Sequence, residues 1–165
     1  MAKHARTSTG SKSRGREGHH GRRAGSAAFM RLLGQHLPTP AEQVGKVALS
    51  AHLSVDILLR GRGGEGEVRQ LVYAINLSLI LCEMGYGVEQ LAVILAAQTA
   101  LGAAGALMCD AGQWKLALNA STAVFQAIEI HEQQIELASE HDLARADLEL
   151  KSRATNGHVT QIHAR

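Results

Sequence analysis

The longest apolar stretch of this chain runs from Val68 to Met108 and is interrupted near its middle by the tripeptide Gly85-Tyr86-Gly87. Before the tripeptide, apolar residues recur at helical spacing and form one continuous face: Val68, Leu71, Val72, Ile75, Leu79 and Cys82. After it, larger apolar residues are separated by alanine and glycine, which allow helices to approach closely: Leu91, Leu95, Leu101 and Met108. The stretch therefore predicts a helical hairpin, buried on several sides, around which the rest of the chain folds.

The second arm of this hairpin also has the length of a membrane-spanning helix. Residues 90–109 carry no charge, and about 20 apolar residues are enough to cross a bilayer. Alanine dominates the run, however, polar residues interrupt it at Gln90, Gln98 and Thr99, and no aromatic belt flanks either arm. We expect the core of a soluble protein and no membrane, with a membrane-associated hairpin as an alternative.

The segment before the hairpin predicts two more helices. Residues 26–37 have an amphipathic pattern, which Pro38 ends. A second helix should start with Thr39 as its N-cap, Pro40 as its first helical residue and Glu42 completing a capping box. Its apolar face is continuous as far as Leu59, and the glycines that follow are expected to end it.

The segment after the hairpin completes the predicted fold. The pattern from Lys115 to Lys151 fits either one long helix or two helices with a break near Ser139. We therefore expect an all-α bundle of four to five helices around the central apolar hairpin. Residues 1–25 should be a disordered basic tail, residues 26–151 the helical bundle and residues 152–165 a frayed C-terminal tail.

The basic tail is the main functional signal in the sequence. Seven Lys or Arg residues and one Glu give residues 1–25 a charge of +6, so the chain's net charge of +2 leaves −4 for the remainder. A polar, cationic segment of this kind neither folds alone nor needs to, and it is suited to contact the phosphates of DNA or RNA without reading sequence. A solubilising tail without a partner is the alternative. The candidate nucleic-acid-binding residues are Lys3, Arg6, Lys12, Arg14, Arg16, Arg22 and Arg23.

A glycine-rich segment, residues 60–67, has the Gly-x-Gly-x-x-Gly spacing of dinucleotide-binding loops. That motif requires a strand before it, whereas a helix is expected here, so we predict a flexible loop between helices. Arg60 and Arg62 remain candidates for a secondary basic loop.

Residue patterns that carry catalysis or bind metals are missing from the sequence. The segment His131-Glu132-Gln133-Gln134-Ile135 lacks the second histidine of a helical zinc site. Cys82 and Cys109 lie in apolar surroundings, which raise the pKa of a thiol and make it unreactive. We expect no enzymatic activity, no cofactor and no metal. Free cysteines and a charged N-terminus favour a cytoplasmic location.

Acidic residues recur every four positions at Glu132, Glu136 and Glu140. This spacing places them on one side of a helix. They are expected to form either a solvated face or an intramolecular binding site for the basic tail.

Three pieces of the chain, residues 74–85, 96–101 and 131–139, resemble small helical proteins of proteobacterial prophages and mobile elements. The resemblance covers roughly the central two-thirds of the chain and consists of helix-packing patterns. Such proteins are sometimes labelled DNA-binding regulators, and no catalytic residue carries over. Separately, the small residues of the second hairpin arm suggest a two-fold interface and hence a homo-oligomer. We therefore expect a non-enzymatic accessory or regulatory protein of a bacterial mobile element or prophage, which contacts nucleic acid through its basic tail. A partner-binding or signal-sequestering bundle without nucleic acid is the alternative.

Overall fold

The computed structural model describes residues 40–111 and 114–158, and within these ranges it contains α-helices and no β-strand. The predicted all-α fold is therefore confirmed. The tail, the amphipathic segment 26–37 and Thr39 lie outside the described residues. The described elements are α2 (Ala41–Leu59), α3 (Glu65–Glu83), the 3-10 helix η1 (Val88–Gln90), α4 (Leu91–Ala111), α5 (Leu118–Leu137) and α6 (Glu140–Thr155).

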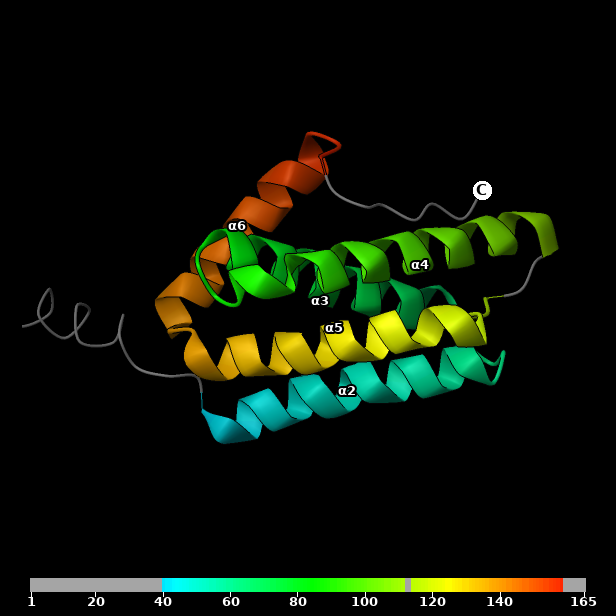
Figure 1. Ribbon diagram of the computed structural model, residues 1–165, viewed down its shortest axis with the longest axis horizontal. Helices are drawn as coiled ribbons and strands as arrows, with labels where there is room; N and C mark the ends of the chain where they lie inside the picture. The colour runs from blue at the N-terminus through cyan, green and yellow to red at the C-terminus, as the bar shows by residue number, and fades with distance from the viewer. Residues whose placement is uncertain (1–39, 112–113, 159–165) are drawn as a thin grey trace, which may run out of the picture.

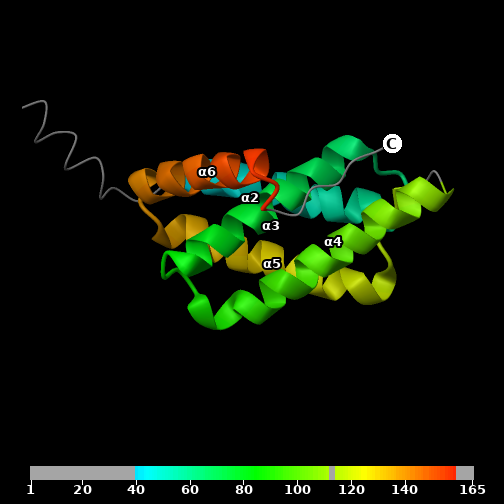
Figure 2. The ribbon, with the colours of Figure 1, turned by 90° about the horizontal axis from the view of Figure 1, so that it is seen from above.

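The helix α3 is the centre of the bundle, because it packs against α2, α4, α5 and α6. Helices α2 and α5 run side by side, while α4 covers α3 and α5 from the other side (Figures 1 and 2). Helix α6 packs on α3 and leaves the common direction of the other helices (Figure 1). Helices α2 and α6 both contact α3 but make at most marginal contact with each other.

The turn between α3 and α4 has the geometry that its glycines predicted. Gly85 has a φ of 105° and Gly87 a φ of 73°, a region that only glycine adopts at little cost. The Cys82 thiol donates a hydrogen bond to the Gly87 carbonyl at 3.1 Å. The two arms are thereby held as the expected hairpin.

The core consists of two clusters on opposite sides of α3. The larger cluster joins α2, α3, α4 and α5, and it contains Val55, Leu58, Leu71, Ile75, Ile94 and Ile128. The smaller cluster joins α3 to α6 through Leu77, Ile80, Leu81, Ala146 and Leu150. Aliphatic side chains of this kind contribute roughly 1.5–3 kcal/mol each when fully buried. The central helix is thus stabilised from both sides.

Helix α4 is buried on one side only, although the sequence predicted an arm buried on several sides. Leu91 and Leu95 are 36% and 46% exposed. The buried side is formed instead by Ile94, Ala97, Ala100, Leu101 and Ala104. Only 28% of the window Val88–Gly105 is buried, so α4 is a surface helix with an apolar outer side.

Two helix boundaries resolve or correct details of the prediction. The segment after Lys115 forms two helices, because α5 ends at Leu137 with Ala138 extended, and Ser139 caps α6 by accepting a hydrogen bond from the Asp142 amide at 3.1 Å. At the start of α2, Pro40 occupies the N-cap and is not the first helical residue. Among the described residues no side chain caps this end, and Glu42 binds Lys46 at 2.7 Å, while Thr39 lies outside the described residues.

Candidate functional site

Of the predicted basic residues, only Arg60 and Arg62 lie within the described ranges; Lys3, Arg6, Lys12, Arg14, Arg16, Arg22 and Arg23 do not. Both described arginines are exposed in the loop between α2 and α3. Arg60 is paired with Asp56 at 2.8 Å. The loop lies at the far end of α2 from Ala41, about 28 Å away at 1.5 Å per residue. It is therefore a basic site separate from the point where the tail joins the bundle.

The loop itself is an interhelical connection with a defined backbone. Gly64 donates its amide hydrogen to the Glu67 carboxylate at 2.8 Å, and backbone hydrogen bonds of this kind, from Gly64 foremost, lower the pKa of Glu67. A side chain at Gly63 would collide with Leu58. Helix α2 stands where a phosphate-binding loop needs a strand, so the dinucleotide spacing carries no such site.

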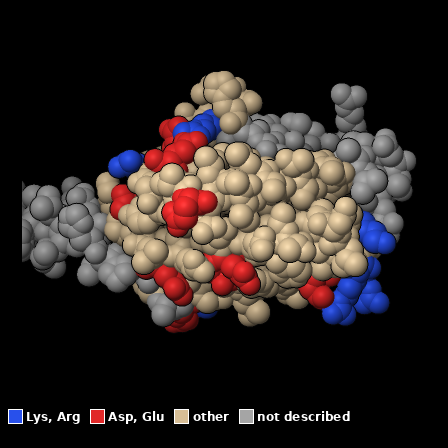
Figure 3. Space-filling model, viewed as in Figure 1, with Lys and Arg blue, Asp and Glu red and all other residues tan. Residues whose placement is uncertain are grey.

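The outer side of α4 is an extended uncharged surface. The helix has no charged residue between Leu91 and Cys109. Figure 3 shows a broad area without Lys, Arg, Asp or Glu over α4 and the adjoining part of α5. The exposed residues of α4 share one side of the helix, and they are Leu91, Ala92, Leu95, Ala96, Thr99, Gly102 and Ala103. Contiguous apolar surface of this kind usually marks an interaction site.

A groove between α2 and α6 consists of a cavity of about 520 Å³ between these two helices and an adjoining cavity of about 330 Å³ that continues it between α2 and α3. Val47 of α2, Tyr73 of α3 and His131 of α5 line both. His131 is 2% exposed and its Nδ1 has no hydrogen-bond partner. Burial lowers the pKa of His131 to about 4, so its imidazole is neutral at pH 7.

The rim of this groove is polar. The Tyr73 hydroxyl donates a hydrogen bond to Asp147 at 2.9 Å, and Lys151 binds the other oxygen of this carboxylate at 2.6 Å. Burial, together with the Asp147 contact, raises the pKa of Tyr73 to about 12. Sequence reasoning missed this groove, since its residues come from four helices; the lone aromatic residue of α3 was the one local signal.

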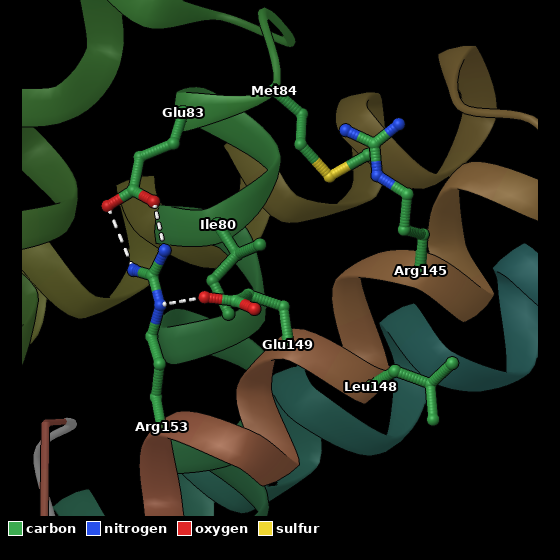
Figure 4. A pocket seen from close by; sticks show the side chains of 7 residues that line it. All are labelled: Ile80, Glu83, Met84, Arg145, Leu148, Glu149 and Arg153. Atoms are coloured by element: carbon green, nitrogen blue, oxygen red, sulfur yellow. Dashed lines mark hydrogen bonds and ion pairs between the residues drawn. The ribbon is translucent and has the colours of Figure 1, made fainter. Parts of the chain in front are cut away.

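A third hollow, of about 470 Å³, lies between α3 and α6 (Figure 4). Arg153 reaches across it and donates to both oxygens of Glu83, at 3.0 and 2.6 Å, and to Glu149 at 2.8 Å. These carboxylates, Glu83 first, raise the pKa of Arg153. Because two acidic groups neutralise it, the arginine joins α6 to α3 and offers no net positive charge to an anionic ligand.

Polar groups inside the bundle serve the fold. The Gln134 amide nitrogen donates to the carbonyls of Ser78 at 3.2 Å and Tyr86 at 2.8 Å, and so ties α5 to the hairpin turn. Burial raises the pKa of the Cys82 thiol, as its apolar context predicted. At the edge of the bundle, His52 contacts Glu132 at 2.7 Å, which engages one of the three periodically spaced acidic residues.

In residues 40–111 and 114–158, no three His, Cys, Asp or Glu side chains are grouped to hold a metal ion. No family model, curated protein or solved structure matches the chain.

Proposed function

We propose that this chain is a non-enzymatic accessory protein, of the prophage or mobile-element kind, that pairs through α4 and contacts DNA or RNA in the cytoplasm through its basic N-terminal residues. The observation that carries the proposal is the exposed, uncharged side of α4. A helix of 21 residues that turns such a side to solvent is suited to pack against an identical helix.

The residues on this side favour a second copy over a lipid surface. Helices that lie on membranes carry large apolar residues on one side and Lys or Arg along the other. Between Leu91 and Gly105, where the burial of α4 is described, its outer side has Leu91 and Leu95 as large residues, and the remainder are alanine, glycine and threonine. Small residues let two helix axes approach to about 8 Å, so that many atoms of the two helices come into contact. The same small residues gain little by contact with lipid.

Pairing supports the nucleic-acid role by doubling the cationic residues in one particle. Each copy contributes seven Lys or Arg residues before residue 25, and the remainder of the chain carries −4. A polyanion is therefore attracted to the N-terminal residues and repelled by the rest of the chain. Two linked cationic segments bind one strand more tightly than either does alone.

The pairing is tested by substituting Gly102, where a new side chain meets no atom within 4 Å in one copy. The variant Gly102→Leu is expected to fold normally and to become monomeric in light scattering, because leucine keeps the helices apart. The matched control is Gly45→Leu on α2, which is equally unobstructed and should remain a dimer. A Gly102→Leu variant that remains dimeric would remove α4 from the proposal.

The nucleic-acid contact is tested with the full chain in which Arg14, Arg16, Arg22 and Arg23 are replaced by serine. Each lost phosphate contact lowers the slope of log Kd against log salt by about 0.9 for duplex DNA, so the slope should fall by up to about 4. Arg60→Ser with Arg62→Ser, in the secondary basic loop, is the comparison and should change the slope by 2 at most, roughly. Unchanged binding by the first variant would exclude the N-terminal residues.

A membrane-associated protein is the second candidate. The window Val88–Gly105 has a mean hydropathy of 1.3 and the length of a span, and most of it is not buried in the bundle. Flotation of the full chain with phosphatidylcholine–phosphatidylglycerol vesicles tests it. Flotation that Leu95→Asp abolishes, in a protein that stays monomeric without lipid, would replace pairing by membrane attachment.

A further inference from the structure

The groove between α2 and α6 has the form of a helix position that no described element fills. Both helices pack on α3 and make at most marginal contact with each other. The larger cavity lies between them, and the smaller one continues it between α2 and α3. The floor of the larger cavity is buried and mostly apolar, formed by Leu77, His131 and Ile135. The α2 wall contains Gln43, Lys46, Ser50 and Ala51 as well as Val47, which remains 37% exposed.

The size of the groove suits about two turns of helix. Its α2 side extends from Gln43 to Ala51, which is about 12 Å along a helix. The floor also holds the buried His131 Nδ1, for which the described part of the chain supplies no hydrogen-bond partner. A buried polar group without a partner, at the base of a groove that is apolar only in part, needs an explanation, and an element that covers the groove would provide one.

The chain itself supplies a segment of matching length beside this groove. Residues 26–37 end three residues before α2 begins at Ala41, and Gln43 lines the groove at that end. Twelve residues of helix are about 18 Å long, enough to cover the groove. Short connections join antiparallel helices, and Pro38 and Pro40 prevent one continuous helix.

We propose that residues 26–37 lie in this groove as a helix antiparallel to α2. Phe29, Leu32 and Leu33 recur at helical spacing and face Val47 and the groove floor, whereas Arg31 points to solvent. The placement puts the junction of residues 25 and 26, where the basic segment ends, on the α2–α6 side of the bundle, away from α4 (Figure 2). It is independent of the pairing through α4.

Hydrogen exchange on the full chain, read by mass spectrometry, tests the placement. The amides of residues 29–36 are expected to exchange at least about tenfold more slowly than in an unstructured peptide. Val47→Arg, at the groove wall, should return them to the unstructured rate. Leu49→Arg is the matched control, since Leu49 is 71% exposed on the same helix and lines neither cavity.

The segment side of the contact is tested with Leu33→Asp, which should also release these amides, and with Arg31→Asp, which should not. Slow exchange within α5 shows that each variant is folded. If Val47→Arg does not fold, Leu33→Asp and Arg31→Asp still test whether the segment lies in the groove. Unprotected amides in the wild type overturn the proposal. So does protection that neither Val47→Arg nor Leu33→Asp removes, or protection that dilution removes, since a second copy then supplies the segment.

Discussion

The two arms of the central hairpin show that apolar composition and burial are separate properties. Helix α4 has no charge between Leu91 and Cys109, whereas α3 carries Glu65, Glu67, Arg69 and Glu83. Yet α3 is the more deeply buried arm, because ten of its 19 residues are buried. In the window Val88–Gly105, which covers most of α4, 28% of the residues are buried. The charges of α3 lie at its two ends, so its middle is free to contact four other helices.

The difference follows from position in the bundle. Helix α3 is surrounded, while the main packing partners of α4 among the α-helices are α3 and α5. An edge helix needs only one apolar side for the core, and α4 has apolar residues all round. The surplus on its outer side is what distinguishes α4 from an ordinary amphipathic helix.

The largest expected effect is a contrast between leucine truncations in the two arms. Leu71 of α3 is fully buried, so Leu71→Ala should lower the free energy of unfolding by about 3 kcal/mol through lost burial and a cavity. Leu95→Ala in α4, at a side chain 46% exposed, should cost less than about 1 kcal/mol. Urea denaturation at a protein concentration that keeps both variants monomeric measures the two costs, and equal costs would contradict the comparison.

The next effect is a pH dependence of the free energy of unfolding, caused by the buried His131 of α5. The pKa of His131 is about 4 when folded against an ordinary 6.5, so the unfolded chain binds the extra proton first. Stability should therefore fall as the pH drops from about 6.5 to about 4, by at most about 3 kcal/mol. Denaturation curves at pH 7 and pH 4.5 measure it.

A His131→Leu variant is the control for this pH dependence, and it should lose the fall within that window. The pKa values of Asp142, held by Ser139 and Tyr86, and of Asp147, held by Lys151 and Tyr73, are also lowered. Their contributions are lost below their ordinary pKa of 3.8, at more acid pH. A fall that persists between pH 6.5 and 4.5 in His131→Leu would assign it to another group.

The smallest effect compares the two glutamines that join each arm to a neighbour. Gln134 is buried and donates to the carbonyls of Ser78 in α3 and of Tyr86 in the hairpin turn. The variant Gln134→Ala should therefore lower the free energy of unfolding by about 2 kcal/mol. Gln98 of α4 is half-buried and donates to Asn76 at 2.8 Å, so Gln98→Ala should cost about 1 kcal/mol or less. Thermal unfolding of the two variants ranks them, and the reverse order would show that α4 is held more firmly than its exposure indicates.

Local signals predicted most of the fold. The turn at Gly85-Tyr86-Gly87 depends on neighbouring residues, so the sequence predicted it, and both glycines have a positive φ. After Lys115 the pattern fitted one helix or two, and the cap formed by Ser139 shows that there are two. The orientation of α4 is different, because alanine and leucine surround the helix and no polar side fixes its rotation. The sequence therefore did not show that Leu91 and Leu95 face outward.

The candidate sites were less accessible to sequence reasoning. The groove unites Val47, Tyr73 and His131, which are far apart in the chain and come together only through packing. Arg60 and Arg62 are exposed as predicted, while their role and that of the N-terminal basic residues stay predictions.

The packing of α2 against α5 has a consequence for how the protein is made. About 60 residues separate the end of α2 from the start of α5, so at roughly 5–20 residues per second the ribosome delivers the second helix about 3–12 s after the first. During that interval α3 covers α2 only in part, and Val55 and Leu58 lack the partner that later buries them fully. Codon choice between these helices therefore sets how long the nascent chain is open to chaperones and to neighbouring chains on the same message.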